Sequence, residues 1–150
     1  MAETDPVLEA AIAALGEAGF KAGVSPVALI LGSGFGAIEE RCKVSAQLEY
    51  EQIPGFARPA GTPGHVCRLT QGRLFGKDVI VLRGRYHAYE GFAARELVFP
   101  VRAAQALGAQ MLIATNAAGG IRDDLAAGSL MAITDHINLL GVNPLVGRQR

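Results

Sequence analysis

The stretch Asp78-Val-Ile-Val-Leu-Arg-Gly-Arg-Tyr-His-Ala-Tyr-Glu-Gly91 joins an apolar run to a polar one, and it is the strongest indication of an α/β fold in the sequence. The apolar half is typical of a buried strand. The polar half begins where that strand ends, which is where ligands bind in α/β sheets. If the extended backbone continues, Arg85, His87 and Tyr89 point to one face, because strand side chains alternate. This pattern predicts an anion site beside a partly apolar ring. The competing interpretation is a solvated turn whose charges serve solubility.

Two further apolar runs end in unusual polar sequences. Val27 to Leu31 is followed by Gly32-Ser33-Gly34-Phe35-Gly36, and Met111 to Thr115 is followed by Asn116-Ala-Ala-Gly-Gly120. Strands that alternate with helices predict an α/β fold with a mixed, partly parallel central sheet flanked by helices. If the three strands run side by side in one direction, all three polar sequences meet at one edge of the sheet. One pocket could then use all of them.

The remaining elements are placed by caps, turns and periodicity. Asp5 and Pro6 suit the start of a helix, and no repeat or linker divides residues 1–150, so we expect a single unit. Further expected elements are a short helix over Phe35–Arg41, a weak strand over Lys43–Gln52, a loop over Ile53–His65, a hairpin of Val66–Leu74 and Lys77–Arg83 around Gly76, a helix over Ala93–Leu107 kinked or started by Pro100, and a strand over Leu130–Thr134.

Composition limits the classes of partner. The chain has 14 basic and 14 acidic residues and no net charge, so no overall field draws it to nucleic acid or to an anionic membrane. The start lacks the pattern of a signal peptide, and no apolar run is long enough to span a bilayer. We expect a soluble cytoplasmic protein. Its two cysteines, Cys42 and Cys67, are expected to be reduced thiols.

The polar groups at the three strand ends suit the binding of an oxyanion. Glycines let backbone N–H groups approach the anion, and Ser33 adds a hydroxyl donor. Arg85 can donate two parallel hydrogen bonds to phosphate. His87 adds a donor that titrates near neutral pH, and Asn116 adds an amide. His65 lies on a loop that could close over the site.

A dinucleotide site is a competing hypothesis. Gly32, Gly34 and Ala37 fit a loose Gly-x-Gly-x-x-Ala pattern, and Glu49 or Glu51 stands near the distance expected of a ribose-binding acid. The intervening segment is short and poorly patterned for the crossover helix that such a fold requires. This hypothesis also leaves the polar groups at the other two strand ends unexplained.

Several catalytic signatures are absent from the sequence. There is no Gly-x-Ser-x-Gly elbow, no His-Glu-x-x-His and no Walker loop. His136, beside Asp135, has no third ligand at a suitable spacing and is expected to be structural rather than metal-binding. The sequence therefore favours anion binding with little covalent machinery.

Taken in order, the motifs resemble the amino-terminal half of trimeric-type purine nucleoside phosphorylases. The matching stretches are Leu31-Gly-Ser-Gly-Phe-Gly36, Pro63-Gly-His65, Gly84-Arg-Tyr-His-Ala-Tyr-Glu-Gly91, Thr115-Asn-Ala-Ala-Gly-Gly120 and Asp135-His-Ile-Asn-Leu-Leu-Gly-Val-Asn-Pro144. The resemblance implies reversible phosphorolysis, in which inorganic phosphate displaces a purine from a ribonucleoside or 2-deoxyribonucleoside. The products are the free base and the pentose 1-phosphate.

The resemblance also implies roles for individual residues. Tyr89 would contact the pentose. Glu90 would order the segment of Arg85 and His87 or help to handle the phosphate proton, so that His87 and Glu90 are the implied catalytic pair. The implied phosphate ligands are Ser33, His65, Arg85, His87, Asn116 and the backbone of Ala117.

The same resemblance implies no metal or organic cofactor; inorganic phosphate is a co-substrate. It also implies a homotrimer. It places residues 1–150 in the amino-terminal part of one nucleoside phosphorylase domain, since the family's purine-recognising residues lie in its carboxyl half. Two alternatives remain within this interpretation. One is a catalytically incomplete phosphate-binding remnant, and the other is a methylthioadenosine phosphorylase.

Overall fold

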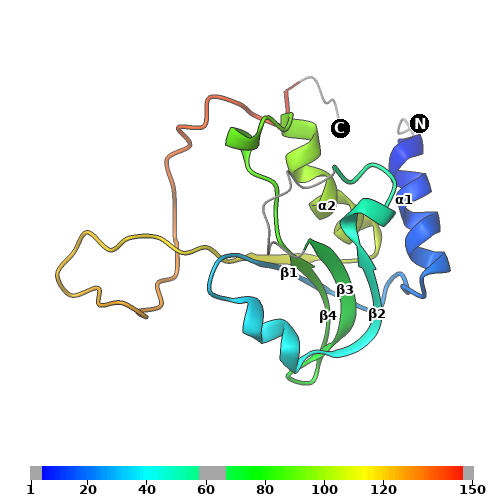
Figure 1. Ribbon diagram of the computed structural model, residues 1–150, viewed down its shortest axis with the longest axis horizontal. Coiled ribbons are helices and arrows are strands. Elements are labelled where there is room, and N and C mark those ends of the chain that lie inside the picture. The colour runs from blue at the N-terminus through cyan, green and yellow to red at the C-terminus, as the bar shows by residue number, and fades with distance from the viewer. Residues whose placement is uncertain (1–4, 58–66, 147–150) are drawn as a thin grey trace.

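The structure is a computed structural model that describes residues 5–57 and 67–146. The described residues form a five-stranded sheet with helices against it (Figure 1). In chain order the elements are α1 (Pro6–Glu17), β1 (Val27–Leu31), the 3₁₀ helix η1 (Gly36–Arg41), β2 (Lys43–Glu49), η2 (Tyr50–Gln52), β3 (Arg68–Leu74), β4 (Lys77–Arg83), η3 (Ala88–Glu90), α2 (Ala94–Ala106) and β5 (Met111–Ala114).

The sheet is mixed, with the strand order β2-β3-β4-β1-β5. Strand β1 lies between β4 and β5 and runs parallel to both, whereas β2, β3 and β4 form an antiparallel series. The prediction of a mixed, partly parallel sheet flanked by helices is therefore confirmed. Because β4, β1 and β5 point the same way, their carboxyl ends lie at one edge of the sheet.

Helices α1 and α2 pack against one another on one face of the sheet. The carboxylate of Asp5 caps α1 by accepting from the N–H groups of Val7 and Leu8 at 3.2 and 3.3 Å, which is the cap predicted from the sequence. Alternate strand residues meet the two helices in the larger core. That core includes Ala11, Leu15, Leu69, Ile80, Leu82, Phe99, Ala103 and Leu107.

The opposite face of the sheet carries a smaller core beneath η1. The strand residues that point away from the α-helices are buried there against Phe35 and Ile38. They are Leu31, Leu74, Val79 and Val81. The 3₁₀ helix η1 thus packs on the sheet directly after the glycine-rich turn, and this packing restricts the position of the turn.

The hairpin predicted around Gly76 is present. Its two central residues, Phe75 and Gly76, both have positive φ, at 48° and 79°. This is the geometry of a type I′ turn, whose twist matches that of the strands it joins. The turn fixes the register of β3 against β4, with Leu74 opposite Lys77.

Two sequence expectations require adjustment. Helix α2 begins at Ala94 and continues through Pro100, so Pro100 does not start it. The strand predicted over Leu130–Thr134 is wrong, because these residues form no helix or strand and are exposed. A strand needs a partner to satisfy its backbone groups, and this segment leaves the sheet beyond β5 (Figure 1).

In the described residues, no helix is long and apolar enough to cross a membrane. Cys42 and Cys67 are free thiols, as expected.

Candidate functional site

The carboxyl ends of β4, β1 and β5 bring three polar segments to one edge of the sheet. We call the segments 32–36, 84–90 and 115–117 together the strand-end site. Thr115 joins two of them, because its hydroxyl oxygen accepts from the N–H of Gly32 at 2.9 Å and its hydroxyl donates to the carbonyl of Ile30 at 3.0 Å. The turn after β1 is thereby tied to the end of β5.

Arg85 connects the third segment to the other two. Its Nη1 donates to the carbonyl oxygen of Thr115 at 3.1 Å, and the side chain is otherwise exposed. One N–H group of the guanidinium is thus bonded to the end of β5, while the side chain remains accessible to solvent. A guanidinium held in this way can present its other N–H groups to an anion.

The glycine-rich turn is compact at its start. An added Cβ at Gly32 would lie 2.3 Å from the carbonyl oxygen of Thr115, so only glycine fits there. Gly34 has a φ of 86°, and the N–H of Phe35 bonds to the carbonyl of Gly32 at 3.1 Å. Ser33 lies at the exposed tip of this turn. The backbone that carries Ser33 is therefore fixed at its base.

The segment after β4 differs from the expected extended strand. The strand ends at Arg83, and Gly84 takes a positive φ of 81° that redirects the chain. Simple alternation of Arg85, His87 and Tyr89 along a strand is therefore wrong, since Tyr89 lies in η3. The imidazole of His87 and the ring of Tyr89 nevertheless stack, with centroids 4.8 Å apart and planes 14° apart.

Glu90 closes the turn that carries these rings. Its carboxylate accepts from the backbone N–H of His87 at 2.8 Å. Tyr89 is 83% exposed, so its ring offers a flat surface to solvent at the outer end of the site. A sugar or another partly apolar ring could contact that surface.

Two buried tyrosines support the segment from below. The hydroxyl of Tyr50 donates to the carbonyl of Gly84 at 3.2 Å, and that of Tyr86 donates to the carbonyl of Ala57 at 2.8 Å. Tyr86 also packs on Tyr50 and on Phe92, with centroids 5.7 and 4.9 Å apart. Burial raises the pKa of both phenols, so they stay protonated and keep donating.

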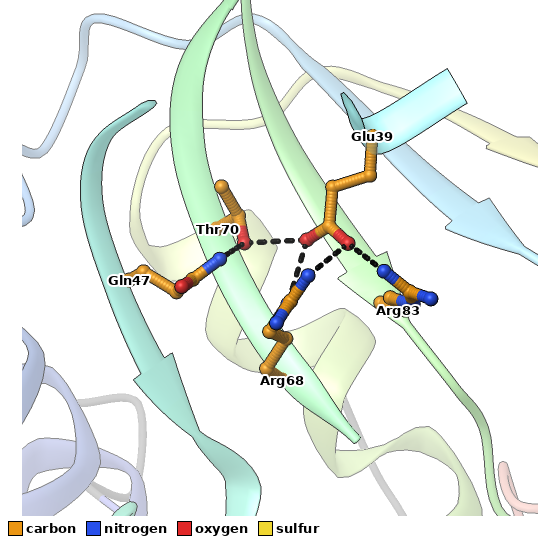
Figure 2. A network of polar contacts seen from close by, with 5 residues as sticks. All are labelled: Glu39, Gln47, Arg68, Thr70 and Arg83. Carbon is orange, nitrogen blue, oxygen red and sulfur yellow. Dashed lines mark hydrogen bonds and ion pairs between the residues drawn. The ribbon is translucent and has the colours of Figure 1, made fainter. Parts of the chain in front are cut away.

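A buried carboxylate lies behind the turn of Ser33. Glu39, in η1, is 4% exposed and is surrounded by donors from β3 and β4 (Figure 2). Arg68 binds both carboxylate oxygens, at 3.0 and 2.8 Å, and Arg83 donates to Oε2 at 2.8 Å. Thr70 donates to Oε1 at 2.8 Å, and its own oxygen accepts from Gln47 at 2.9 Å.

This network keeps Glu39 ionised. Burial by itself would raise the pKa of the carboxyl, but the hydrogen bonds from Arg68, Arg83 and Thr70 outweigh it and hold the pKa below its ordinary value. The same pairing raises the pKa of Arg68. The result is a buried anion paired with two cations. Arg68 starts β3 and Arg83 ends β4, and the two are opposite one another at the edge of the sheet that carries the strand-end site.

The other residues singled out from the sequence fall in different places. Asn116 and Ala117 follow β5 and are exposed at the same edge as Ser33 and Arg85. His65 lies outside the described residues. His136 is exposed beside Asp135, whose carboxylate accepts from its backbone N–H at 2.8 Å. Among residues 5–57 and 67–146, no three His, Cys, Asp or Glu side chains are grouped as a metal site would need.

The structure contradicts the geometry required for a dinucleotide site at the glycine turn. The turn leads into a short 3₁₀ helix and then into β2, which pairs antiparallel with β3, rather than into a crossover helix and a parallel neighbour. Glu49 ends β2 and Glu51 lies in η2 directly after it, at the far side of the sheet from β1. Neither can serve as the ribose-binding acid beside this turn.

Sequence reasoning missed three residues that shape the site: Glu39, Tyr50 and Thr115. Thr115 stood in a quoted motif without a role, and its position at the end of an apolar run was the available signal. Arg68 and Thr70 are two apart on one strand, which places them on one face, but nothing local indicates that Glu39 meets them. Tyr50 gave no signal beyond its aromatic character.

Comparison with known proteins gives one consistent family. Residues 26–150 match the family described as the Phosphorylase superfamily. The chain is 48% identical over 122 residues to purine nucleoside phosphorylase 1 of Bacillus subtilis, covering 81% of the chain and 44% of that protein. It is 44% identical over 126 residues to purine nucleoside phosphorylase of Mycobacterium tuberculosis, covering 83% of the chain and 47% of that protein. The chain thus spans less than half the length of these relatives.

The fold has a counterpart among solved structures. Isoform 2 of purine nucleoside phosphorylase from Schistosoma mansoni, in complex with cytosine and ribose-1-phosphate, superposes with a TM-score of 0.83 at 31% sequence identity. The superposition covers 96% of this chain and 50% of that one.

Proposed function

The chain belongs to the phosphorylase superfamily, and on that premise we propose that its strand-end site binds inorganic phosphate and the pentose of a purine nucleoside for phosphorolysis. The observation that carries this proposal is the strand order β4-β1-β5. It brings the segments of Ser33, Arg85 and Thr115 to one edge of the sheet. The relative that is solved with ribose-1-phosphate supports it, because that molecule is the product expected of the reaction.

In this proposal the phosphate is held by the hydroxyl of Ser33, the guanidinium of Arg85, the imidazole of His87, the amide of Asn116 and the backbone N–H of Ala117, together with His65. Hydrogen bonds from charged donors to an anion are stronger than neutral ones. The stacked ring of Tyr89 contacts the pentose. Glu90 fixes the His87 backbone through its hydrogen bond and thus orients the imidazole.

The chemistry needs little beyond positioning. A phosphate oxygen forms a bond to the anomeric carbon as the glycosidic bond breaks, and the purine leaves with the bonding electron pair and gains a proton. Positive charge develops on the pentose in the transition state, and the bound phosphate lies next to it and stabilises it. Inorganic phosphate is the co-substrate, and the proposal involves no metal or organic cofactor.

We extend the proposal to the organisation of the whole protein. Residues 1–150 form part of a single nucleoside phosphorylase domain, with the purine-recognising groups supplied by other residues. Every residue of β5 is exposed, as are the apolar side chains Leu112 and Ile113 on its two faces, whereas parallel strands of α/β folds are covered on both faces. By likeness to the family we also propose a cytoplasmic homotrimer that acts in purine salvage.

The proposal is tested with Arg85→Ala and His87→Ala in the whole protein that contains this chain. Losing a charged hydrogen bond to phosphate should raise the KM for phosphate about tenfold to a hundredfold, with a much smaller effect on the KM for inosine or guanosine. Arg73→Ala is the matched control, since Arg73 is an exposed arginine at the hairpin end of the sheet, bonded to the carbonyl of Gly76. Unchanged phosphate dependence in both site variants would overturn the assignment.

A further inference from the structure

Glu39 lies between two of the three segments of the strand-end site, 32–36 and 84–90. It stands three residues after Gly36, where the glycine-rich turn ends, and its Oε2 accepts from Arg83, which ends β4 two residues before Arg85. A Cβ built on Gly36 would lie 3.5 Å from Nη2 of Arg83, so the guanidinium packs directly against the end of the turn. Figure 2 shows η1 held above β3 and β4 by this carboxylate.

The glycine-rich turn is therefore fastened at both ends. Its first residue, Gly32, is bonded to Thr115, and its last, Gly36, is also the first residue of η1, whose only buried acidic side chain is Glu39. Of the three residues between these points, Ser33 and Gly34 are exposed, whereas Phe35 packs against the smaller core. Movement of η1 would move the turn, because the two share Gly36.

From this arrangement we infer that Glu39 is a positioning residue, which through Arg83 and Arg68 holds the Ser33 turn in register with the Arg85 arm for phosphate binding. The effect of Glu39 on phosphate binding rests on the proposed function. Its effect on the position of the turn does not depend on any activity.

Charge supports the same role. Arg68 and Arg83 are partly exposed on their side chains, at 24% and 29%, while the Glu39 side chain is 3% exposed. Without the carboxylate, the guanidinium groups of Arg68 and Arg83 would lose their anionic partner. Arg83 would then compete with Arg85 for an anion bound at the site. Glu39 thus also keeps the guanidinium of Arg83 paired.

The first measurement is steady-state kinetics of Glu39→Gln in the whole protein that contains this chain. We expect the KM for phosphate to rise about tenfold, because small misplacements of a binding group are costly, while the KM for nucleoside changes less than about twofold. Asp5→Asn is the matched control, since it breaks the 2.7 Å pair between Asp5 and Arg102. It should lower the Tm without changing either KM.

A loss of Tm in Glu39→Gln with an unchanged KM for phosphate would reduce Glu39 to a structural role and overturn the inference. If Glu39→Gln fails to fold, Arg83→Met replaces it. This variant removes the link to β4, yet the two hydrogen bonds of Arg68 still compensate the buried carboxylate. It should raise the KM for phosphate in the same selective way, and no change would again overturn the inference.

The second measurement separates this inference from the proposed function. Amide hydrogen exchange of residues 32–36 should become about tenfold faster in Glu39→Gln or Arg83→Met, as expected for local opening, while the β4 amides of residues 79–82 keep their rates. Unchanged exchange in the turn would overturn the inference even if the protein is a phosphorylase. Faster exchange in a protein that makes no use of phosphate would support the positioning role and reject the proposed function.

Discussion

The guanidinium of Arg85 donates to the carbonyl oxygen of Thr115 at 3.1 Å, so the Arg85 side chain joins the segments that leave β4 and β5 directly. Thr115 also bonds to the backbone of Gly32 through its hydroxyl. One residue therefore connects all three arms of the strand-end site. The relative positions of these arms are set by direct hydrogen bonds as well as by the strand ladder.

Replacing Thr115 tests this connection. Thr115→Val keeps the shape of the side chain but leaves the N–H of Gly32 and the carbonyl of Ile30 without the hydroxyl. We expect a loss of about 1–3 kcal/mol in the free energy of unfolding, together with weaker use of phosphate. Urea denaturation and the KM for phosphate measure the two effects. Thr134→Val, at an exposed threonine away from the sheet, is the control that should change neither.

The glycine turn gives a second prediction. Gly32→Ala would place a Cβ 2.3 Å from the carbonyl oxygen of Thr115, so the backbone at the base of the turn must shift. We expect a loss of stability of about 1–3 kcal/mol, as for other overpacked sites, and a large rise in the KM for phosphate. In contrast, Gly16→Ala in α1 meets nothing within 4 Å and should stabilise the protein by about 0.4–1 kcal/mol. Equal effects of the two substitutions would contradict the crowding at Gly32.

The stability of the protein should depend on the charge of Glu39. Its pKa in the folded state lies below the ordinary value, so its contribution is fully present above about pH 4.5 and is lost as the pH falls through the folded-state pKa. The free energies of unfolding of the native protein and of Glu39→Gln should therefore differ most near neutral pH and converge in acid. Urea titrations from about pH 7 to about pH 3 measure this difference. A gap that stays constant across that range would show that the charge is not responsible.

Much of the fold could be predicted because its signals are local. Each of β1, β4 and β5 is an apolar run that ends at a turn, and the alternation of Ile80 with Val81 across two faces follows from strand geometry alone. Asp5 and Gly76 are likewise local signals, for a cap and for a hairpin. The meeting of three strand ends was conditional on strand order, which the structure supplies.

The remaining features depend on contacts that are distant in sequence. Gly84 turns the chain out of the strand, so the alternation expected for Tyr89 fails even though its ring still stacks on His87. Glu39 lies 29 residues from Arg68 and 44 from Arg83, and no periodicity connects them. The strand expected over residues 130–134 shows the converse, because a favourable composition forms no strand without a neighbour to pair with.

The central claim is that the strand-end site delivers phosphate as the nucleophile. The most direct measurement is the identity of the pentose product when the whole protein that contains this chain acts on inosine or guanosine, with and without inorganic phosphate. We expect pentose 1-phosphate, formed only when phosphate is present and strongly reduced by Arg85→Ala at limiting phosphate. Release of free pentose at a rate that is independent of phosphate would contradict it.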